Sequence, residues 1–292
     1  MRCACIDIGT NTTRLLVAEP GPEGLREVLA QRVFTRIGRA LDEAGAISAP
    51  KLEEVAEVVA AQARAARALG ADSLDAVATA AIRAAPNRAD LVAAVSAAAD
   101  LELKVLTGEE EARFAFAGAT RALAEPPSGP VGVVDVGGGS TELAVGTLDE
   151  GVTWIASLEI GSGGLADRHL RSDPPAGEDL GALRNEAAEA FAGIAAPHPN
   201  LAVAVGGSAT SLGRLVGPCL DAPALRDALD LIVSAPAAEV ARRHDLDAER
   251  VRLLPGGLAV LEEAVRAFGV PLQVAGGGLR EGVIHRRLAE AG

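Results

Sequence analysis

The chain has 292 residues, which is enough for two domains with substantial cores, and 49% of its residues are hydrophobic while 2% are aromatic. The formal net charge of −13 argues against nucleic acid or an anionic membrane surface as a partner. No apolar run is long enough to span a bilayer, and the first predicted strand starts too close to Met1 for a signal peptide, so we expect a cytoplasmic, globular protein.

The first predicted element is a β-meander that carries a small polar loop. An apolar strand ends at Asp7, and a second apolar strand resumes after Gly9 and three small polar residues. These residues are Thr10, Asn11 and Thr12. A third extended segment at 25–34 completes the meander.

The three cysteines are expected to be buried free thiols. Cys3 and Cys5 are two residues apart in the first strand, so they share a face and cannot easily bridge each other. Cys219 is isolated in the sequence. Without a Cys-x-x-Cys motif or clustered histidines, a zinc site is not expected.

A polar segment with two arginines follows the meander. The predicted elements around it are a helix at 50–69, a strand at 73–79 and a helix at 89–98. Thr79, Arg83 and Arg88 fall on the loop between this strand and the second helix. The planar guanidinium fork of arginine suits phosphate oxygens, and the alternative for either arginine is a solvated surface position.

Three consecutive acids come after a strand predicted at 101–106. Thr107 as N-cap and Glu110 at the third helical position predict a capping box, and acids in a first turn favour the helix dipole. The run of Glu109, Glu110 and Glu111 exceeds what capping needs, so one of them is a candidate general base; the alternative is a solvated charge run. The Pro-rich linker at 124–130 then predicts a domain boundary near residue 125.

The stretch at 131–145 repeats the plan of the first loop. An apolar run reaches Asp135, and a second apolar run begins at Glu142. Between them lie Gly137, Gly138, Gly139, Ser140 and Thr141. Glycines have no Cβ, so their N–H groups can converge on an oxyanion. The carboxylates of Asp135 and Glu142 would repel a phosphate bound there unless a hard cation such as Mg²⁺ lies between them. The alternative is a glycine-rich hairpin that only reverses the chain.

The two similar loops predict two similar domains, with both loops closing on one ligand between them. The later elements expected are an extended segment at 152–160, helices at 165–171, 178–194 and 257–268, more than one helix across 222–244, strands at 201–205 and 271–275, and a terminal helix. After the strand at 201–205, Gly206, Gly207 and Ser208 meet a helix N-terminus, which is a third candidate anion or nucleotide site.

Six motifs in order resemble the exopolyphosphatase / guanosine pentaphosphate phosphohydrolase family over nearly the whole chain. The motifs are Asp7-Ile-Gly-Thr-Asn, Thr79-Ala-Ala-Ile-Arg83, Gly108-Glu-Glu-Glu-Ala-Arg113, Asp135-Val-Gly-Gly-Gly-Ser-Thr-Glu142, Gly206-Gly-Ser-Ala-Thr and Gly278-Leu-Arg-Glu-Gly282. One departure is that Thr10 and Thr12 stand where serines are often seen, which keeps the hydroxyls. The chain resembles the short form of the family, without the C-terminal helical domain.

The resemblance implies an α/β fold of two ribonuclease-H-like domains, as in actin, sugar kinases and Hsp70, with the active site in the interdomain cleft. We expect an N-terminal domain at 1–125 and a C-terminal domain at 126–292, the last helix packing back on the first domain.

The resemblance also implies roles for individual residues. Glu111 matches the catalytic glutamate and is the expected base that activates water, while Glu142 matches the second carboxylate and is the alternative base. Asp7, Asp135 and Glu142 are the expected ligands of Mg²⁺ or Mn²⁺. The expected phosphate-binding residues are Thr10, Asn11, Thr12, Arg83, Gly137, Gly138, Gly139, Ser140, Thr141, Gly207 and Ser208.

The activity implied is metal-dependent hydrolysis of the terminal phosphate of inorganic polyphosphate by in-line attack of water. The net charge of −13 and the small, separate arginine groups offer no extended basic track, so we expect short chains to be preferred. The alternatives are hydrolysis of pppGpp, non-catalytic sensing of (p)ppGpp or polyphosphate, and an ATP-dependent small-molecule kinase of the same superfold. We also expect a homodimer, with (p)ppGpp or another nucleotide as a candidate inhibitor, and neither nucleic acid nor a membrane as partner.

Overall fold

A computed structural model describes residues 1–22 and 24–291, which form two compact units. Unit 1 comprises Met1–Ala124 with Gly277–Gly292, and unit 2 comprises Glu125–Gly276. The sequence assigns 277–292 to the second domain with its last helix on the first; in the structure, these residues belong to unit 1. No helix in the described residues combines the length and apolar character needed to cross a bilayer.

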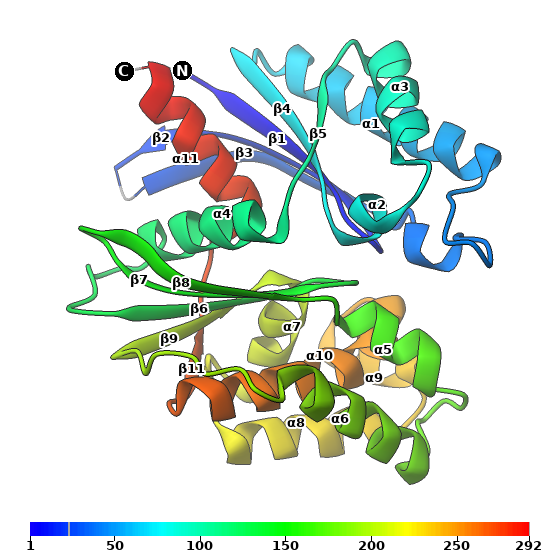
Figure 1. Ribbon diagram of the computed structural model, residues 1–292, viewed down its shortest axis with the longest axis vertical. Helices are drawn as coiled ribbons and strands as arrows, with labels where there is room; N and C mark the ends of the chain where they lie inside the picture. The colour runs from blue at the N-terminus through cyan, green and yellow to red at the C-terminus, as the bar shows by residue number, and fades with distance from the viewer. Residues whose placement is uncertain (23, 292) are drawn as a thin grey trace. The chain divides into compact units, whose positions relative to one another are not determined.

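Unit 1 is a five-stranded mixed sheet with helices on both faces (Figure 1). Its elements are β1 (Cys3–Ile8), β2 (Thr13–Gly21), β3 (Gly24–Val33), η1 (Ile37–Arg39), α1 (Ala49–Ala68), β4 (Ser73–Ala78), α2 (Ala80–Ala84), α3 (Arg88–Ala99), β5 (Leu103–Val105), α4 (Gly108–Arg121) and α11 (Leu279–Ala291). The strand order is β3-β2-β1-β4-β5, in which β1, β2 and β3 form the predicted antiparallel meander and β4 and β5 add in parallel.

The alternation of side chains along β1 builds a core on each face of this sheet. Ala4, Ile6 and Ile8 point into the cluster formed with α1 and α3, whereas Cys3 and Cys5 point into the cluster formed with α11. Burial raises the pKa of the Cys5 thiol well above its usual value, so this thiol stays protonated. The predicted free thiols Cys3 and Cys5 are buried, but Cys219 is exposed.

Glycines allow α11 to pack directly on α4. A Cβ at Gly282 would lie 2.0 Å from the Phe114 carbonyl oxygen, and a Cβ at Gly118 would lie 2.0 Å from the Gly278 carbonyl oxygen. At the other end of the helix, the Arg287 guanidinium donates two hydrogen bonds to the Asp75 carboxylate of β4, from Nε to Oδ2 at 3.1 Å and from Nη2 to Oδ1 at 2.5 Å. These contacts hold the last helix within unit 1.

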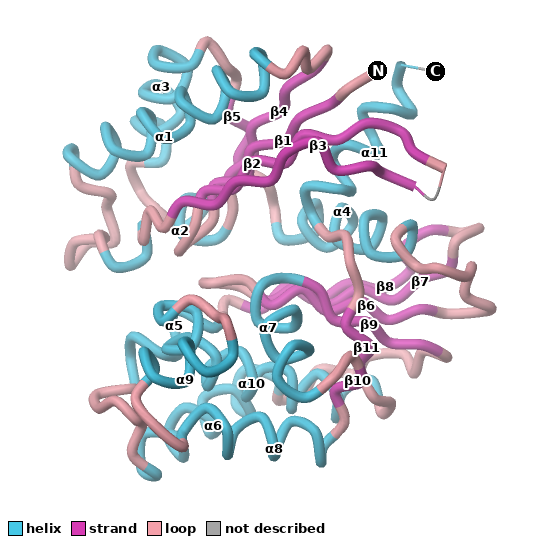
Figure 2. Tube along the Cα trace, turned by 180° about the vertical axis from the view of Figure 1, so that it is seen from behind, coloured by secondary structure: helices cyan, strands magenta, loops and turns pink. Residues whose placement is uncertain are grey.

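Unit 2 repeats the topology with a six-stranded sheet (Figure 2). Its elements are β6 (Val131–Val136), β7 (Thr141–Thr147), β8 (Gly151–Leu158), α5 (Ser162–His169), α6 (Gly177–Phe191), β9 (Leu201–Val205), α7 (Gly206–Val216), β10 (Cys219–Leu220), α8 (Ala222–Val233), α9 (Ala237–His244), α10 (Ala248–Phe268) and β11 (Leu272–Val274). In the order β10-β11-β9-β6-β7-β8, the antiparallel meander β6-β7-β8 corresponds to β1-β2-β3, and β9 and β11 correspond to β4 and β5. Two meander-plus-parallel sheets in one chain are the predicted pair of ribonuclease-H-like domains.

The start of α10 and the placement of the two arginines were predicted wrongly, and one strand was not predicted. Helix α10 begins at Ala248, nine residues before the predicted start at 257, because the Asp247 side chain caps it and buried leucines carry the helix through Pro255. Arg83 lies in the short helix α2 and Arg88 is the first residue of α3, so neither arginine lies in a loop. The two-residue edge strand β10 carries no periodic signal and was not predicted.

Candidate functional site

The two polar loops close in the same way. In loop 1 (residues 9–12) the Gly9 N–H donates to the Thr12 carbonyl at 3.0 Å, and in loop 2 (residues 137–140) the Gly137 N–H donates to the Ser140 carbonyl at 3.0 Å. Within residues 1–22 and 24–291, the remaining N–H groups of either loop donate to no backbone carbonyl. Both loops therefore present a short row of backbone donors, the arrangement that binds oxyanions.

In unit 1, loop 1 lies beside a buried carboxylate. Asp7 on β1 pairs in register with Arg14 on β2, and its Oδ1 is buried without a hydrogen-bond partner. Burial raises the pKa of Asp7, and the nearby Arg14 and Arg280 guanidinium groups oppose that shift. Arg14 also reaches the loop, because its Nε donates to Thr12 Oγ1 at 3.1 Å.

Thr10 has a second buried polar atom without a hydrogen-bond partner at loop 1. It is buried, and its Oγ1 makes no hydrogen bond within the described residues. A buried hydroxyl without a partner is costly, so this position suits a polar ligand atom. Asn11, the third residue expected here, is only partly buried.

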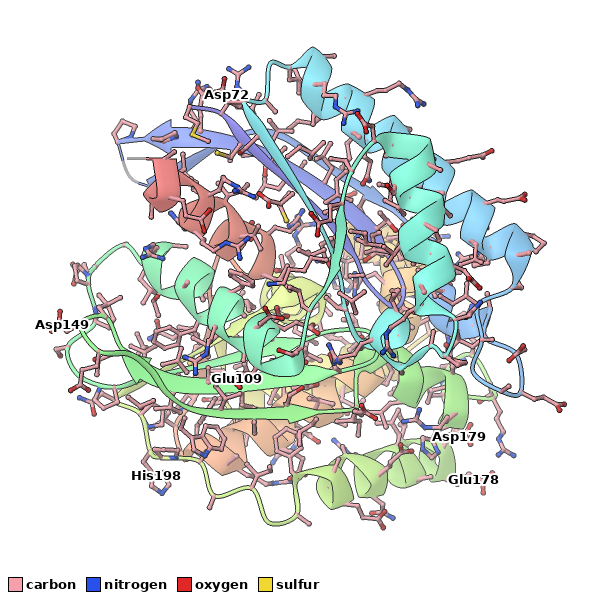
Figure 3. All side chains as sticks on the ribbon, turned by 45° about the horizontal axis from the view of Figure 1, so that its top comes forward. Asp72, Glu109, Asp149, Glu178, Asp179 and His198 are labelled. Carbon is pink, nitrogen blue, oxygen red and sulfur yellow. The ribbon has the colours of Figure 1, made fainter. Side chains whose placement is uncertain are left out.

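The three consecutive glutamates at the start of α4 have three different environments. Successive side chains of a helix point about 100° apart, so they cannot all face the same surroundings. Glu110 forms the predicted capping box with Thr107 and bonds Lys104 Nζ at 2.6 Å, which lowers its pKa, the Lys104 hydrogen bond contributing most. Glu109, labelled in Figure 3, is exposed and pairs with Arg113 at 2.7 Å. Glu111 is turned inward and only 5% exposed.

Glu111 meets Arg83 in unit 1. The Arg83 Nη1 forms an ion pair with Glu111 Oε1 and donates to the Leu106 carbonyl at 3.0 Å. In the part of the chain that the structure describes, Nε and Nη2 of Arg83 donate to no protein group. The predicted base and the predicted phosphate-binding arginine are therefore neighbours, and the arginine keeps N–H groups for an anion.

In unit 2, the second carboxylate lies opposite the first across adjacent strands. Asp135 on β6 pairs in register with Glu142 on β7, which pairs in turn with Ser157 on β8. Glu142 is 4% exposed and accepts a hydrogen bond from Ser157 Oγ at 3.2 Å. Two carboxylates in register at one end of loop 2 concentrate negative charge there, which a bound cation would stabilise.

These residues fit a hard divalent cation. Across residues 1–22 and 24–291 no three His, Cys, Asp or Glu side chains gather into a group. Mg²⁺ is usually held by one or two carboxylates, with water and substrate phosphates completing its octahedron. Asp135 and Glu142 of unit 2 supply such a pair. Mg²⁺ or Mn²⁺ therefore suits these two carboxylates. In unit 1, Asp7 has a buried oxygen that lacks a hydrogen-bond partner.

The Gly206-Gly207-Ser208 segment at the start of α7 adds an arginine that the sequence did not indicate. A Cβ on Gly207 would lie 2.6 Å from Nη2 of Arg250 on α10, so the guanidinium packs on the bare backbone at this helix N-terminus. Arg250 is 6% exposed, and Ser208 is fully buried with no hydrogen-bond partner for its Oγ among the described residues. A Cβ on Gly206 would lie 2.6 Å from Asp135 Oδ1, which places this segment beside the carboxylate pair.

The predicted residues thus fall into two groups. Unit 1 holds Asp7, Thr10, Asn11, Thr12, Arg83 and Glu111, and unit 2 holds Asp135, Gly137, Gly138, Gly139, Ser140, Thr141, Glu142, Gly207 and Ser208. Thr141 differs from the others, since it is fully buried and its Oγ1 donates to the Ile160 carbonyl at 2.6 Å. The sequence analysis did not identify Arg14 and Arg250 as candidate site residues. Arg14 could have been identified from its position just after loop 1, whereas no sequence motif marks Arg250.

Comparison with known proteins gives one family. The sequence profile of the Ppx/GppA phosphatase family matches residues 16–291. Exopolyphosphatase 1 of Mycobacterium tuberculosis is 31% identical over 306 aligned residues, covering 99% of this chain and 88% of that protein. The guanosine-5'-triphosphate,3'-diphosphate pyrophosphatase of Aeromonas hydrophila is 25% identical, covering 97% of this chain and 58% of that protein. A crystal structure of the Aquifex aeolicus Ppx/GppA family member matches with a TM-score of 0.83 at 28% identity, covering 100% of this chain and 98% of that one.

Proposed function

The chain belongs to the Ppx/GppA phosphatase family, whose members hydrolyse phosphoanhydride bonds, and from this premise we propose that its substrate is the terminal phosphate of inorganic polyphosphate. The observation that carries the proposal is the repeated loop, which in each unit offers backbone donors to an oxyanion beside carboxylates or arginines. The relatives named exopolyphosphatase, which the chain matches over almost its full length, support polyphosphate as the substrate.

The reaction we propose is in-line displacement at the terminal phosphorus. The oxygen of a water molecule bonds to phosphorus, the bond from phosphorus to the bridging oxygen breaks, and the shortened chain leaves with that oxygen and its negative charge. Such a reaction needs little covalent chemistry from the protein, so positioning and charge stabilisation provide most of the rate. The loop N–H groups and Arg83 would hold the terminal phosphate oxygens.

Glu111 is the residue that we propose accepts the proton of the water. It is buried, and its ion pair with Arg83 favours the carboxylate form, which is the form that can accept a proton. The same ion pair fixes the carboxylate next to an arginine that can contact the phosphate. Glu142 has a different setting, because it faces Asp135 and accepts from Ser157.

Asp7, Asp135 and Glu142 are the residues that would hold Mg²⁺ or Mn²⁺. When bound, the cation supplies charge neutralisation for the phosphate oxygens. Without it, Asp135 and Glu142 would repel the anionic substrate, and Arg250 together with the first N–H groups of α7 would be left to offset that repulsion.

The charge distribution supports short chains as the preferred substrate. A long polyphosphate would need an extended basic track, yet several arginine groups are neutralised within the protein. Arg168 pairs with Glu186, Arg243 with Glu239, and Arg286 and Arg287 with Asp75 and Glu290. The net charge of −13 acts against long-range attraction of a polyanion.

The test is phosphate release from purified protein, with short polyphosphate, polyphosphate of several hundred units and pppGpp measured side by side at fixed Mg²⁺. We expect the highest kcat/KM on short polyphosphate. Higher kcat/KM on long chains with strong salt dependence would contradict the preference for short chains. Higher kcat/KM on pppGpp would favour the second candidate function, which the relative from Aeromonas hydrophila supports.

A further inference from the structure

The segment that follows the third strand of each meander lies against the corresponding loop. In unit 2, the Gly137 carbonyl accepts from the N–H and the Oγ of Ser162, at 3.0 and 3.1 Å. The Gly138 carbonyl accepts from the N–H groups of Gly163 at 2.9 Å and Gly164 at 3.0 Å. The first turn of α5 therefore satisfies two successive carbonyls of loop 2.

In unit 1, residues 36–38 also hold two successive loop carbonyls, but this pair lies one residue further along the loop than the pair held in unit 2. The Thr10 carbonyl accepts from the Gly38 N–H at 2.9 Å, and the Asn11 carbonyl accepts from the Arg36 N–H at 3.0 Å. The residue after each loop is also fixed to the start of this segment, through Thr13 and Thr35 hydroxyls at 3.1 Å in unit 1 and through Thr141 and the Ile160 carbonyl in unit 2. In each unit, the segment after the meander therefore fixes two successive loop carbonyls, of which only Thr10 and Gly138 are equivalent positions.

Because the peptide group is planar, the hydrogen bonds to the loop carbonyls also determine where the loop N–H groups point. In a trans peptide the C=O of one residue and the N–H of the next point to opposite sides. Holding the carbonyls of Gly137 and Gly138 toward α5 therefore turns the N–H groups of Gly138 and Gly139 away from it. By the same reasoning, the bonds in unit 1 direct the N–H groups of Asn11 and Thr12 away from residues 36–38.

We propose that residues 161–164 and 36–38 are positioning segments, which hold the loop carbonyls so that the N–H groups of Gly138 and Gly139, and of Asn11 and Thr12, are aimed at a phosphate group. The proposal rests on the proposed function for the identity of the anion. It assigns these segments no contact with the substrate, and it explains the residue type at position 161. A Cβ on Gly161 would lie 2.6 Å from the carbonyl carbon of Gly138 and 2.7 Å from the nitrogen of Gly139.

The test compares two glycines of the same segment. Gly161→Ala pushes on the Gly138–Gly139 peptide itself, which is backbone and must move. Gly164→Ala is the matched control, because its added methyl group would meet only the Arg168 guanidinium at 3.0 Å, the end of a flexible side chain, and because alanine keeps the N–H that bonds Gly138. Ser162→Ala is the milder second variant, since it removes the Oγ bond to Gly137 and keeps the N–H bond.

Two measurements are made on each protein: kcat/KM for short polyphosphate, and the change in the amide resonances of Gly138 and Gly139 when inorganic phosphate is added to ¹⁵N-labelled protein. We expect phosphate to shift both resonances in the wild type and in Gly164→Ala. In Gly161→Ala these shifts should disappear and kcat/KM should fall about 10²-fold, as when an oxyanion donor is lost. Ser162→Ala should weaken the Gly138 shift and raise KM more than it lowers kcat.

Unchanged phosphate shifts and unchanged kcat/KM in Gly161→Ala would overturn the proposal, as would a wild type in which phosphate leaves both resonances in place. If Gly161→Ala does not fold, Ser162→Ala decides, and an undiminished Gly138 shift there overturns the proposal. Failure of the proposed function looks different: a wild type that hydrolyses no polyphosphate but shows phosphate shifts that Gly161→Ala abolishes supports the positioning role alone.

Discussion

Replacing Glu111 by glutamine tests the assignment of the general base. Glutamine keeps the shape of the side chain and an oxygen that can accept from Arg83 Nη1, but it cannot take a proton. Loss of a general base typically lowers the rate by about 10²–10⁴-fold. We therefore expect kcat of Glu111→Gln on short polyphosphate to fall by that amount while substrate binding survives.

The Arg83–Glu111 contact also indicates how much Glu111→Gln lowers the free energy of unfolding. An ion pair is exchanged for a hydrogen bond from the charged Arg83 to a neutral amide oxygen, a difference of about 1 kcal/mol, and the Arg83 side chain is 24% exposed, so water compensates part of it. For a protein of this size that corresponds to a decrease in Tm of about 2–4 °C. A loss of this size leaves nearly all molecules folded at assay temperature, so unfolding cannot explain a 10²-fold fall in rate.

The neighbouring acid Glu109 provides a matched control. Glu109→Gln removes an exposed pair with Arg113 and should leave both activity and Tm almost unchanged. Steady-state phosphate release and thermal unfolding are measured on all variants together with Glu142→Gln. Near-normal turnover in Glu111→Gln combined with loss in Glu142→Gln would reverse the assignment and make Glu142 the base.

Three further predictions concern metal, packing and pH. Asp135→Asn should raise the Mg²⁺ concentration needed for half-maximal rate and lower the maximal rate, and excess EDTA should abolish wild-type activity; full activity in EDTA would remove the metal from the reaction. Gly282→Ala should destabilise by about 1–3 kcal/mol in denaturant unfolding because its methyl group meets the Phe114 backbone, whereas Gly181→Ala, in open space on α6, should not destabilise. Because the pKa of Glu110 is lowered in the folded state, its stabilisation is present above the unfolded pKa of about 4.3 and is lost as pH falls through the folded pKa. The Tm of Glu110→Gln should therefore decrease less than that of the wild type between pH 6 and pH 3, and equal decreases would contradict this role.

Sequence reasoning found the parts of the site that depend on residue type at fixed spacing. Both loops are identifiable because a carboxylate, glycines and hydroxyls follow an apolar strand, and the capping box is identifiable because Thr107 and Glu110 are three residues apart. The three acids of α4 could be ranked only by resemblance, since burial separates Glu111 from Glu109 and burial depends on what α4 packs against.

The parts that sequence reasoning missed depend on contacts between distant residues or on the backbone alone. Arg250 reaches Gly207 only because α10 begins nine residues earlier than its Pro255-Gly256-Gly257 segment indicates. The bonds from α5 to loop 2 join backbone groups, which every residue type except proline can supply, so they leave no pattern beyond the glycine at position 161. Arg83 and Glu111 are 28 residues apart, and only the fold shows that they form one ion pair.

The two units also differ at one informative position. The residue that pairs with the strand-end aspartate is Arg14 in unit 1 and Glu142 in unit 2, although both follow their loop at the same spacing. An arginine beside Asp7 compensates its charge and adds a donor for anions, whereas a glutamate beside Asp135 doubles the negative charge and favours a cation. The same backbone plan therefore places a positive side chain beside the strand-end aspartate in unit 1 and a second negative one in unit 2.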